Sequence, residues 1–163
     1  MAFFEWLETL FFSQWVRESG SLMAFPMFLF SHTLGMSMVA GGSTLISFAF
    51  LGLWPKGGAI KPLERLYPMM WFGFGVNAFT GIGLFCADAT TRAVNLDFWI
   101  KLVFVAVGVV ALVRMRKVFR NPVLDNGPVP PGAKTLAWVS LVCWFGAIVA
   151  GRLIAYVGPV AGV

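Results

Sequence analysis

The sequence predicts an all-α fold, an integral membrane four-helix bundle. Hydrophobic residues make up 59% of the 163 residues and charged residues 12%, too few to cover the surface of a water-soluble domain of this length. Four apolar stretches are long enough to cross a hydrocarbon core of about 30 Å, which takes roughly 20 helical residues. No internal repeat or second domain is visible, so we expect one membrane domain over residues 1–163, with the lipid bilayer as its main solvent. The four predicted transmembrane helices are residues 22–54, 66–87, 98–119 and 136–157.

Residues 3–17 precede the first span and predict an interfacial amphipathic helix. At about 100° per residue, the large apolar side chains gather on one arc, while Glu5, Thr9 and Ser13 fall on another. The N-terminus has no basic region and carries Glu5 and Glu8 early, which is unlike an ordinary signal peptide, so we expect it to be retained. Two interpretations are open for this helix: a membrane-surface anchor, or a docking surface for a partner subunit.

The first predicted span is longer than a bilayer requires. Residues 22–54 would reach roughly 50 Å as a helix, so this segment should tilt, kink or protrude, and Pro26 and the Gly41-Gly42-Ser43 cluster are the expected places. Small residues recur on the first two spans at intervals that allow close helix packing, within the bundle or against another protein. They are Ser31 and Gly35, Ser37 and Gly41, and Gly73, Asn77 and Gly81.

The lysines and arginines are distributed unequally between the two sides of the bundle. The connections after the first and third spans, which are rich in proline and glycine, carry eight of the twelve cations. The positive-inside rule therefore predicts that both connections are cytoplasmic and that both termini lie on the outer, periplasmic side. Because the cations read as topology signals, the net charge of +5 predicts no nucleic-acid partner. The eight cations on the cytoplasmic side are Lys56, Lys61, Arg65, Arg114, Arg116, Lys117, Arg120 and Lys134. The four on the other side are Arg17, Arg92, Lys101 and Arg152.

His32 is the only histidine, and it falls two or three turns inside the first span. An ionisable group at that depth is expensive in lipid, which makes His32 a candidate cofactor-binding or metal-binding residue. A neutral imidazole can ligate haem iron or copper, or hydrogen-bond a quinone or pigment. The alternative is a packed histidine bonded to a neighbouring hydroxyl or carbonyl group.

Three further polar residues belong to the candidate site. Arg152 and Asp88 should lie in the same outer half of the bundle as His32, where Arg152 could pair with Asp88 or with an anionic ligand such as a haem propionate. The alternative is an arginine that reaches the headgroups. Asn77, with Thr80, could bond across helices or to a bound group.

Other sites receive weaker support from the sequence. Met36 follows His32 by one turn and could join it on Cu(I), but core filling is the simpler interpretation. Cys86 and Cys143 lack the spacing of a disulfide framework or zinc site. Nucleotide-binding loops, metalloprotease motifs, nucleophile elbows and paired intramembrane carboxylates are not found in the sequence, so hydrolytic or nucleotide chemistry is not expected.

Several short motifs follow one another in a specific order. They are Phe25-Pro26, His32-Thr33-Leu34-Gly35, Leu51-Gly52-Leu53, Trp71-Phe72-Gly73-Phe74, Thr80-Gly81, Lys101, Trp144-Phe145-Gly146 and Ala150-Gly151-Arg152-Leu153-Ile154-Ala155-Tyr156. From about Trp15 to Tyr156 the chain resembles an uncharacterised family of small four-helix bacterial inner-membrane proteins. The resemblance implies that His32, Gly35, Gly81 and Arg152 match recurring family residues, and it implies no activity.

The same resemblance bears on haem. Family members often carry an acidic residue three positions before the histidine, an aspartate and an arginine near the inner end of the first helix, and a histidine late in the third. Those places hold Leu29, Ser47, Ala49 and Met115 here. Ligation of haem by two histidines of this chain is therefore not expected, and Met115 should lie on the order of 15 to 25 Å deeper than His32.

Three functions remain open at this point. The first is a small accessory subunit of a larger bacterial respiratory or photosynthetic membrane complex, since the chain is small and shows no complete catalytic set. The second is an electron-transfer subunit that holds a b-type haem on His32 and exchanges electrons with a quinone or a periplasmic carrier. The third is a copper-handling membrane protein using His32 and Met36.

Overall fold

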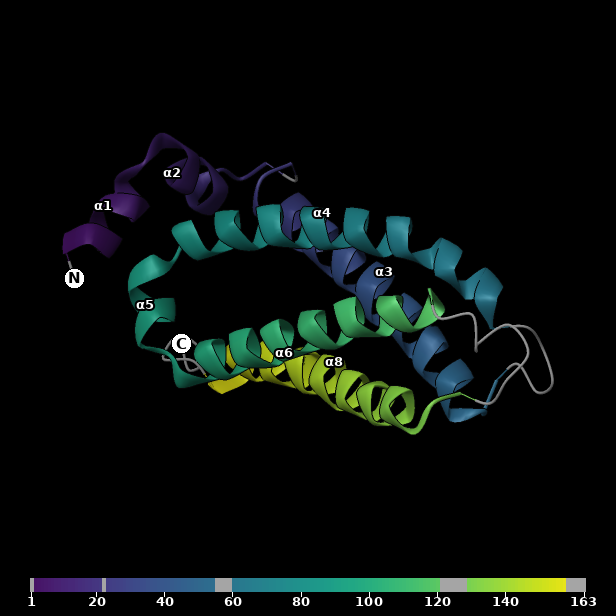
Figure 1. Ribbon diagram of the computed structural model, residues 1–163. Coiled ribbons are helices and arrows are strands. Elements are labelled where there is room, and N and C mark those ends of the chain that lie inside the picture. Colours follow the sequence, from purple (N-terminus) through teal and green to yellow (C-terminus); the bar gives the residue numbers. More distant parts are fainter. Residues whose placement is uncertain (1, 22, 55–59, 121–128, 158–163) are drawn as a thin grey trace.

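The structure, a computed structural model, describes residues 2–21, 23–54, 60–120 and 129–157. Every regular element in those ranges is a helix, which confirms the all-α prediction (Figure 1). Four helices are long and apolar enough to cross a membrane, so the chain has the make-up of a multi-pass membrane protein. They are α3 (Phe25–Leu51), α4 (Leu66–Cys86), α6 (Leu96–Phe119) and α8 (Pro131–Val157).

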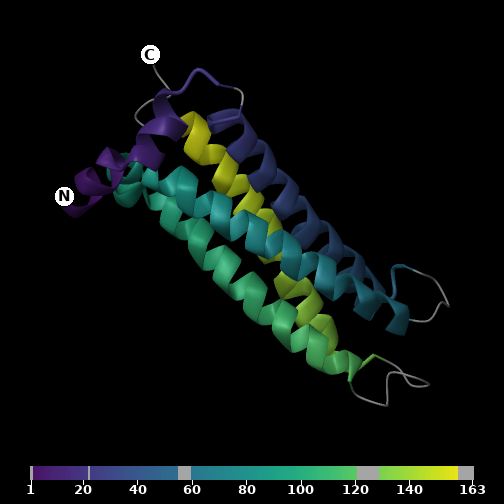
Figure 2. The ribbon, with the colours of Figure 1, turned by 90° about the horizontal axis from the view of Figure 1, so that it is seen from above.

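The four long helices form a bundle in which α3 is the central partner. It packs against α4 and α8, and α8 packs in turn against α6, whereas α4 and α6 have no comparably close approach. The short helices α1 (Ala2–Thr9), α2 (Phe11–Glu18) and α5 (Ala89–Val94) gather at one end, which we name the α5 end. Figure 2 shows the last turns of α8 at this same end.

The first span is shorter than predicted and is not interrupted. It covers 27 residues, or about 40 Å. Pro26 does not kink the helix because it lies in the first helical turn, where its missing N–H group breaks no hydrogen bond. The helix continues through Gly41, Gly42 and Ser43 without a break. It ends at Gly52, whose φ of 75° is the left-handed conformation that a glycine adopts freely after a helix.

The second span begins at Leu66, as predicted, whereas the third and fourth begin before their predicted starts. A short 3₁₀ helix, η1 (Lys61–Arg65), leads into α4. The third span begins at Leu96 because the side chain of Asn95 accepts hydrogen bonds from the backbone N–H groups of Asp97 and Phe98, at 2.8 and 3.3 Å. The fourth begins at Pro131, five residues before the predicted start, where proline is again suited to a first turn.

The best-buried side chains lie toward the end opposite α5. Phe50, Tyr67, Met115 and Phe119 pack together there, and the rings of Phe50 and Phe119 lie 5.3 Å apart. The hydroxyl of Tyr67 donates to the carbonyl oxygen of Leu112 at 3.3 Å, so its polar atom is satisfied within the bundle. Large apolar side chains thus hold one half of the bundle, and the polar candidates lie in the other half.

The N-terminal segment forms two short helices where one was predicted over residues 3–17. The chain turns at Leu10, whose ψ of 139° is extended. Both helices dock on the α5 end: Glu8 accepts hydrogen bonds from the backbone N–H and the hydroxyl of Thr90, each at 2.7 Å, and the ring of Phe12 lies 5.4 Å from that of Phe28. These helices are therefore tied to the bundle through α5 and α3.

Candidate functional site

The candidate site surrounds His32, which lies about two turns into α3 from the α5 end. The imidazole faces Gly81 on α4. A Cβ atom at position 81 would lie only 3.0 Å from Cε1 of His32, so the glycine makes room for the ring. One turn further along, Gly35 and Gly73 bring the two backbones together, since a Cβ on Gly35 would lie 2.6 Å from the carbonyl oxygen of Gly73.

Polar groups of α4 fix one side of the imidazole. Nδ1 of His32 lies 3.0 Å from the carbonyl oxygen of Asn77 and 3.2 Å from Oγ1 of Thr80. A carbonyl oxygen can only accept, so the bond to Asn77 requires the proton on Nδ1. The side-chain amide of Asn77 in turn donates to the carbonyl oxygen of His32 at 2.8 Å. This reciprocal pair of bonds joins α3 to α4 and orients the ring.

Lys101 approaches the other side of the imidazole from α6. Its Nζ lies 3.5 Å from Nε2 of His32, the nitrogen that is left with a lone pair. Gly151 on α8 lies beside the lysine stem, since a Cβ there would be in ordinary van der Waals contact with Cε of Lys101, at 3.6 Å. All four long helices therefore contribute to the site, which consists of His32, Asn77, Thr80, Lys101 and the two glycines Gly81 and Gly151.

Lys101 has no carboxylate partner in the described part of the chain. The ion pairs found there join Arg17 to Glu8 and Glu18, and Arg92 to Asp88. An ammonium group inside a membrane helix is costly, and a neutral imidazole offsets only part of that cost. Two of the three ammonium N–H donors are left for other acceptors, so this end of the site is suited to a carbonyl or anionic oxygen.

The structure brings two of the predicted site residues together and leaves two apart. His32 and Asn77 are in direct contact. Asp88 lies at the start of α5, where Nε of Arg92 approaches its carboxylate to 3.4 Å, without hydrogen-bond geometry. Arg152 is exposed and makes no polar contact within the described residues. The suggested pairing of Arg152 with Asp88 is therefore not formed, because Arg92, one turn after Asp88, takes that place.

A haem does not fit on His32 as the side chains are arranged. Since Nδ1 is bonded to Asn77, Nε2 would have to be the ligand, and a bond from imidazole nitrogen to metal is about 2 Å long. The ammonium of Lys101 stands at that nitrogen. Lys101 would have to swing away before a metal could bind.

The described residues offer no group of side chains that would join His32 in binding copper. Within the described ranges, no group of three or more His, Cys, Asp or Glu side chains is placed to hold a metal ion. Met36 packs against the apolar cluster. Cys86 is half-buried, and both it and the buried Cys143 are free thiols.

Lys101 is the functional candidate that sequence reasoning treated as a topology signal. A signal was present, since Lys101 is the one charged residue in the run 98–113 of α6. Comparison of the chain with models of known families, with curated proteins and with solved structures gives no match. The class of protein is therefore defined by the fold alone, a multi-pass α-helical membrane protein, and the family resemblance stays a prediction.

Proposed function

We propose that this chain is a small integral membrane accessory subunit of a larger bacterial membrane complex, of the respiratory or photosynthetic kind. Its place is the inner membrane, with the α5 end and both termini in the periplasm and with α1 and α2 at the membrane surface. The unequal distribution of the cations supports this orientation. The observation that carries the proposal is a row of small residues on the outward face of α3.

This row, which we name the α3 outer face, consists of Thr33, Ser37 and Gly41. The three residues are spaced by four, so they lie on one side of the helix, and all are exposed. A Cβ atom added to Gly41 would meet nothing within 4 Å. The hydroxyls of Thr33 and Ser37 are satisfied by the carbonyl oxygens of Leu29 and Leu34 on the same helix. The small side chains of this face would therefore allow the backbone of a second helix to approach closely.

The inward glycines of α3 show how such a face is used. Gly35 touches the α4 backbone, and a Cβ on Gly42 would lie 2.7 Å from Cγ of Met70. In lipid, helix association depends on this kind of close approach, because apolar burial gives little driving force between helices. A helix of a partner subunit would pack on the α3 outer face in the same way.

The test is co-purification of membrane partners in a mild detergent. Gly41→Leu should abolish or strongly reduce a stoichiometric partner recovered with the wild-type protein. Ala106→Leu is the matched control, because it places the same leucine side chain at an exposed small residue of α6. Recovery of the protein alone from native membranes after crosslinking, or equal partner loss in both variants, would contradict the proposal.

A second candidate function is electron transfer at His32, with a b-type haem and a quinone or periplasmic carrier. The observation that favours it is the anchoring of Nδ1 on a backbone carbonyl, the usual way in which a ligating histidine is held. The position of Lys101 disfavours haem, because its ammonium group lies at the nitrogen that would ligate the iron. It favours an oxygen ligand, such as a quinone carbonyl, that accepts a hydrogen bond from the ammonium.

An optical spectrum separates these versions. A reduced-minus-oxidised difference spectrum with a haem Soret band that disappears in His32→Ala would support haem. A protein without that band, whose extractable quinone content falls in Lys101→Met and not in Lys134→Met, would support an oxygen ligand. A protein with neither haem nor quinone would leave electron transfer without support.

A further inference from the structure

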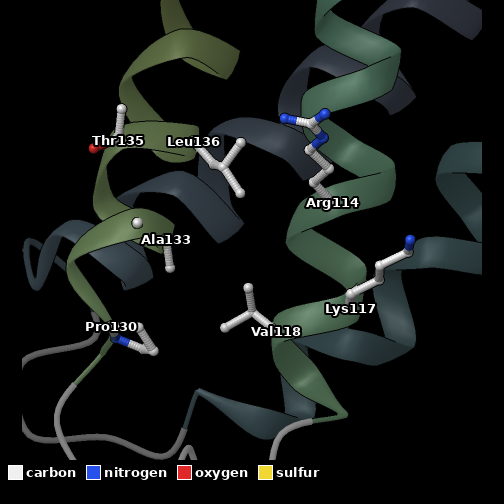
Figure 3. Close-up of a pocket in the computed structure, with 8 residues that line it drawn as sticks. Arg114, Lys117, Val118, Pro130, Ala133, Thr135 and Leu136 are labelled. Carbon is white, nitrogen blue, oxygen red and sulfur yellow. The ribbon is translucent and has the colours of Figure 1, made fainter.

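A hollow lies between α6 and α8 at the end opposite α5. Its volume is about 610 Å³, and it is open to the outside. Figure 3 shows its two walls: Arg114, Lys117 and Val118 come from α6, and the first turns of α8 lie opposite. Val118 points toward α8 in this view, whereas the ammonium group of Lys117 points away from it. This hollow is separate from the His32 site, which lies toward the other end of the bundle. The α8 wall consists of Pro130, Gly132, Ala133, Thr135 and Leu136.

Among the described residues that line the hollow, the charged ones are cations only. They are Arg114 and Lys117, two exposed residues of α6. Neither cation makes an ion pair or hydrogen bond in the described part of the chain, which is the condition in which both can bind an anion from outside. The facing wall lies at the N-terminus of α8, a 27-residue helix, and the partial positive charge of that N-terminus adds to the charge of the cations.

The rest of the lining is apolar and leads into the lipid-facing surface. Val118, Ala133 and Leu136 contribute hydrocarbon to the hollow. Arg114 follows directly on the apolar run of α6, in which Val110 and Val113 are exposed. An occupant with a charged group in the hollow could therefore lay apolar chains along α6.

We propose that this hollow binds the phosphate of an anionic phospholipid, with Arg114 and Lys117 as the phosphate-binding residues. The guanidinium of Arg114 supplies a planar pair of donors that matches phosphate oxygens. Lys117 adds a point charge when its flexible side chain turns toward α8. Basic pockets between membrane helices recognise anionic headgroups in this way. The acyl chains occupy the exposed valine surface of α6, which a free phosphate ion would leave empty.

The test uses the full chain in detergent, stripped of lipid. Native mass spectrometry measures the binding of phosphatidylglycerol, cardiolipin and phosphatidylcholine, and inorganic phosphate is titrated in a separate arm. We expect retention of the two anionic lipids, weak retention of phosphatidylcholine, and no comparable effect of inorganic phosphate. The double variant Arg114→Gln/Lys117→Gln should weaken binding of the anionic lipids by at least about tenfold.

The matched control is Arg65→Gln/Arg120→Gln, which removes two exposed cations outside the hollow. It should change lipid binding by less than about twofold. Equal binding of phosphatidylcholine by the wild-type chain would overturn the proposal without any variant. An equal loss of lipid binding in the control variant would show that the whole charged surface attracts the lipid and that there is no specific site. Binding of inorganic phosphate without selectivity among the lipids would show an anion site that does not recognise phospholipids.

Discussion

At the residue scale, His32 and Lys101 are polar groups that the membrane makes expensive. The cost of the histidine is offset by hydrogen bonds to Asn77 and Thr80, so it can be explained as a packing element. The lysine has only the imidazole as a polar partner within the described residues. A group that folding alone does not explain is the better candidate for function.

This difference predicts opposite effects of two substitutions. Lys101→Met keeps the length of the side chain and removes the charge, so it should raise the stability of the detergent-solubilised protein, by on the order of 1 kcal/mol. His32→Ala removes the ring and leaves the hydroxyl of Thr80 and the carbonyl of Asn77 without their hydrogen-bond partner. It should therefore lower the free energy of unfolding by about 1–3 kcal/mol. Thermal unfolding followed by circular dichroism measures both. A loss of stability in Lys101→Met as large as that in His32→Ala would show that the lysine is structural.

A second prediction concerns two glycines of α3. Gly35→Ala places a methyl group 2.6 Å from the carbonyl oxygen of Gly73 and should force α3 and α4 apart, at a cost of about 1–3 kcal/mol. Gly41→Ala meets empty space and should be neutral or slightly stabilising, because alanine favours a helix over glycine by about 1 kcal/mol. The melting temperatures of the two variants in one detergent make the comparison. Equal melting temperatures would contradict the packing of Gly35 on α4.

The site could be predicted from the sequence only in part. A single histidine inside an apolar run stands out by its cost, and Asn77 stands out beside Gly73 and Gly81. Which side chains meet depends on the rotation of each helix about its axis, and apolar spans in lipid carry little periodicity that would fix it. For that reason the sequence places Arg152 near Asp88, and it marks Lys101 as an outer-side cation and a motif position without indicating that it meets His32.

At the element scale, the helix pairs differ in what joins them. Glycines join α3 to α4, and a buried hydrogen bond joins α3 to α8, between the hydroxyls of Ser43 and Ser140 at 2.6 Å. Either hydroxyl alone would be an unsatisfied group inside the bundle. The bond therefore contributes to stability mainly because each hydroxyl satisfies the other, and less through its own attraction.

Removing one of the two hydroxyls should cost more than removing both. Ser43→Ala should destabilise by about 0.5–1.5 kcal/mol, and Ser43→Ala/Ser140→Ala should recover part of that loss. Equilibrium unfolding of the two single variants and the double variant in a detergent–denaturant mixture gives the coupling. Strict additivity of the two single losses would mean that the hydroxyls do not interact.

The docking of α1 and α2 should depend on pH. Hydrogen bonds from the backbone N–H and hydroxyl of Thr90, with a smaller contribution from the charge of Arg17, lower the pKa of Glu8 below its ordinary value of 4.5. Since the docked state favours the carboxylate, its contribution is present above the ordinary pKa and is lost as pH falls through the lowered pKa. The two helices should therefore loosen as the pH falls below the ordinary pKa of 4.5 and through the lowered pKa of Glu8.

A spin label tests this loosening. Placed at Glu5→Cys in a chain whose two native cysteines are replaced by alanine, the label should become more mobile as the pH falls. In a Glu8→Gln background its mobility should not change with pH, because the titrating group is gone. A transition of the same size in that background would assign the effect to another group.

The number and type of the long helices followed from the sequence because an apolar run of spanning length is rarely anything but a membrane helix. The C-terminal ends of the last three spans agree with the prediction to within one residue, but the starts of the third and fourth spans and both ends of the first do not. Hydropathy marks where lipid begins, whereas a helix starts where a cap or proline allows it, as at Asn95 and Pro131. The turn at Leu10, which divides the N-terminal segment, left no glycine or proline signal.

At the scale of the whole molecule, the two ends of the bundle have different roles. The α5 end carries the short helices and the His32 site, and the opposite end carries the apolar cluster and the basic hollow (Figure 2). An even number of spans places the start and end of the chain on one side of a membrane. The proposed docking on α3 and the lipid site beside α6 both require these four helices to lie in lipid.

Cysteine labelling in intact cells tests that arrangement most directly. In a chain without its native cysteines, Glu18→Cys marks the α5 end and Lys134→Cys marks the opposite end. A membrane-impermeant maleimide, applied to cells with a permeabilised outer membrane, should label position 18 at once and position 134 only after the inner membrane is disrupted. Labelling of position 134 in cells with an intact inner membrane would contradict the four-span orientation.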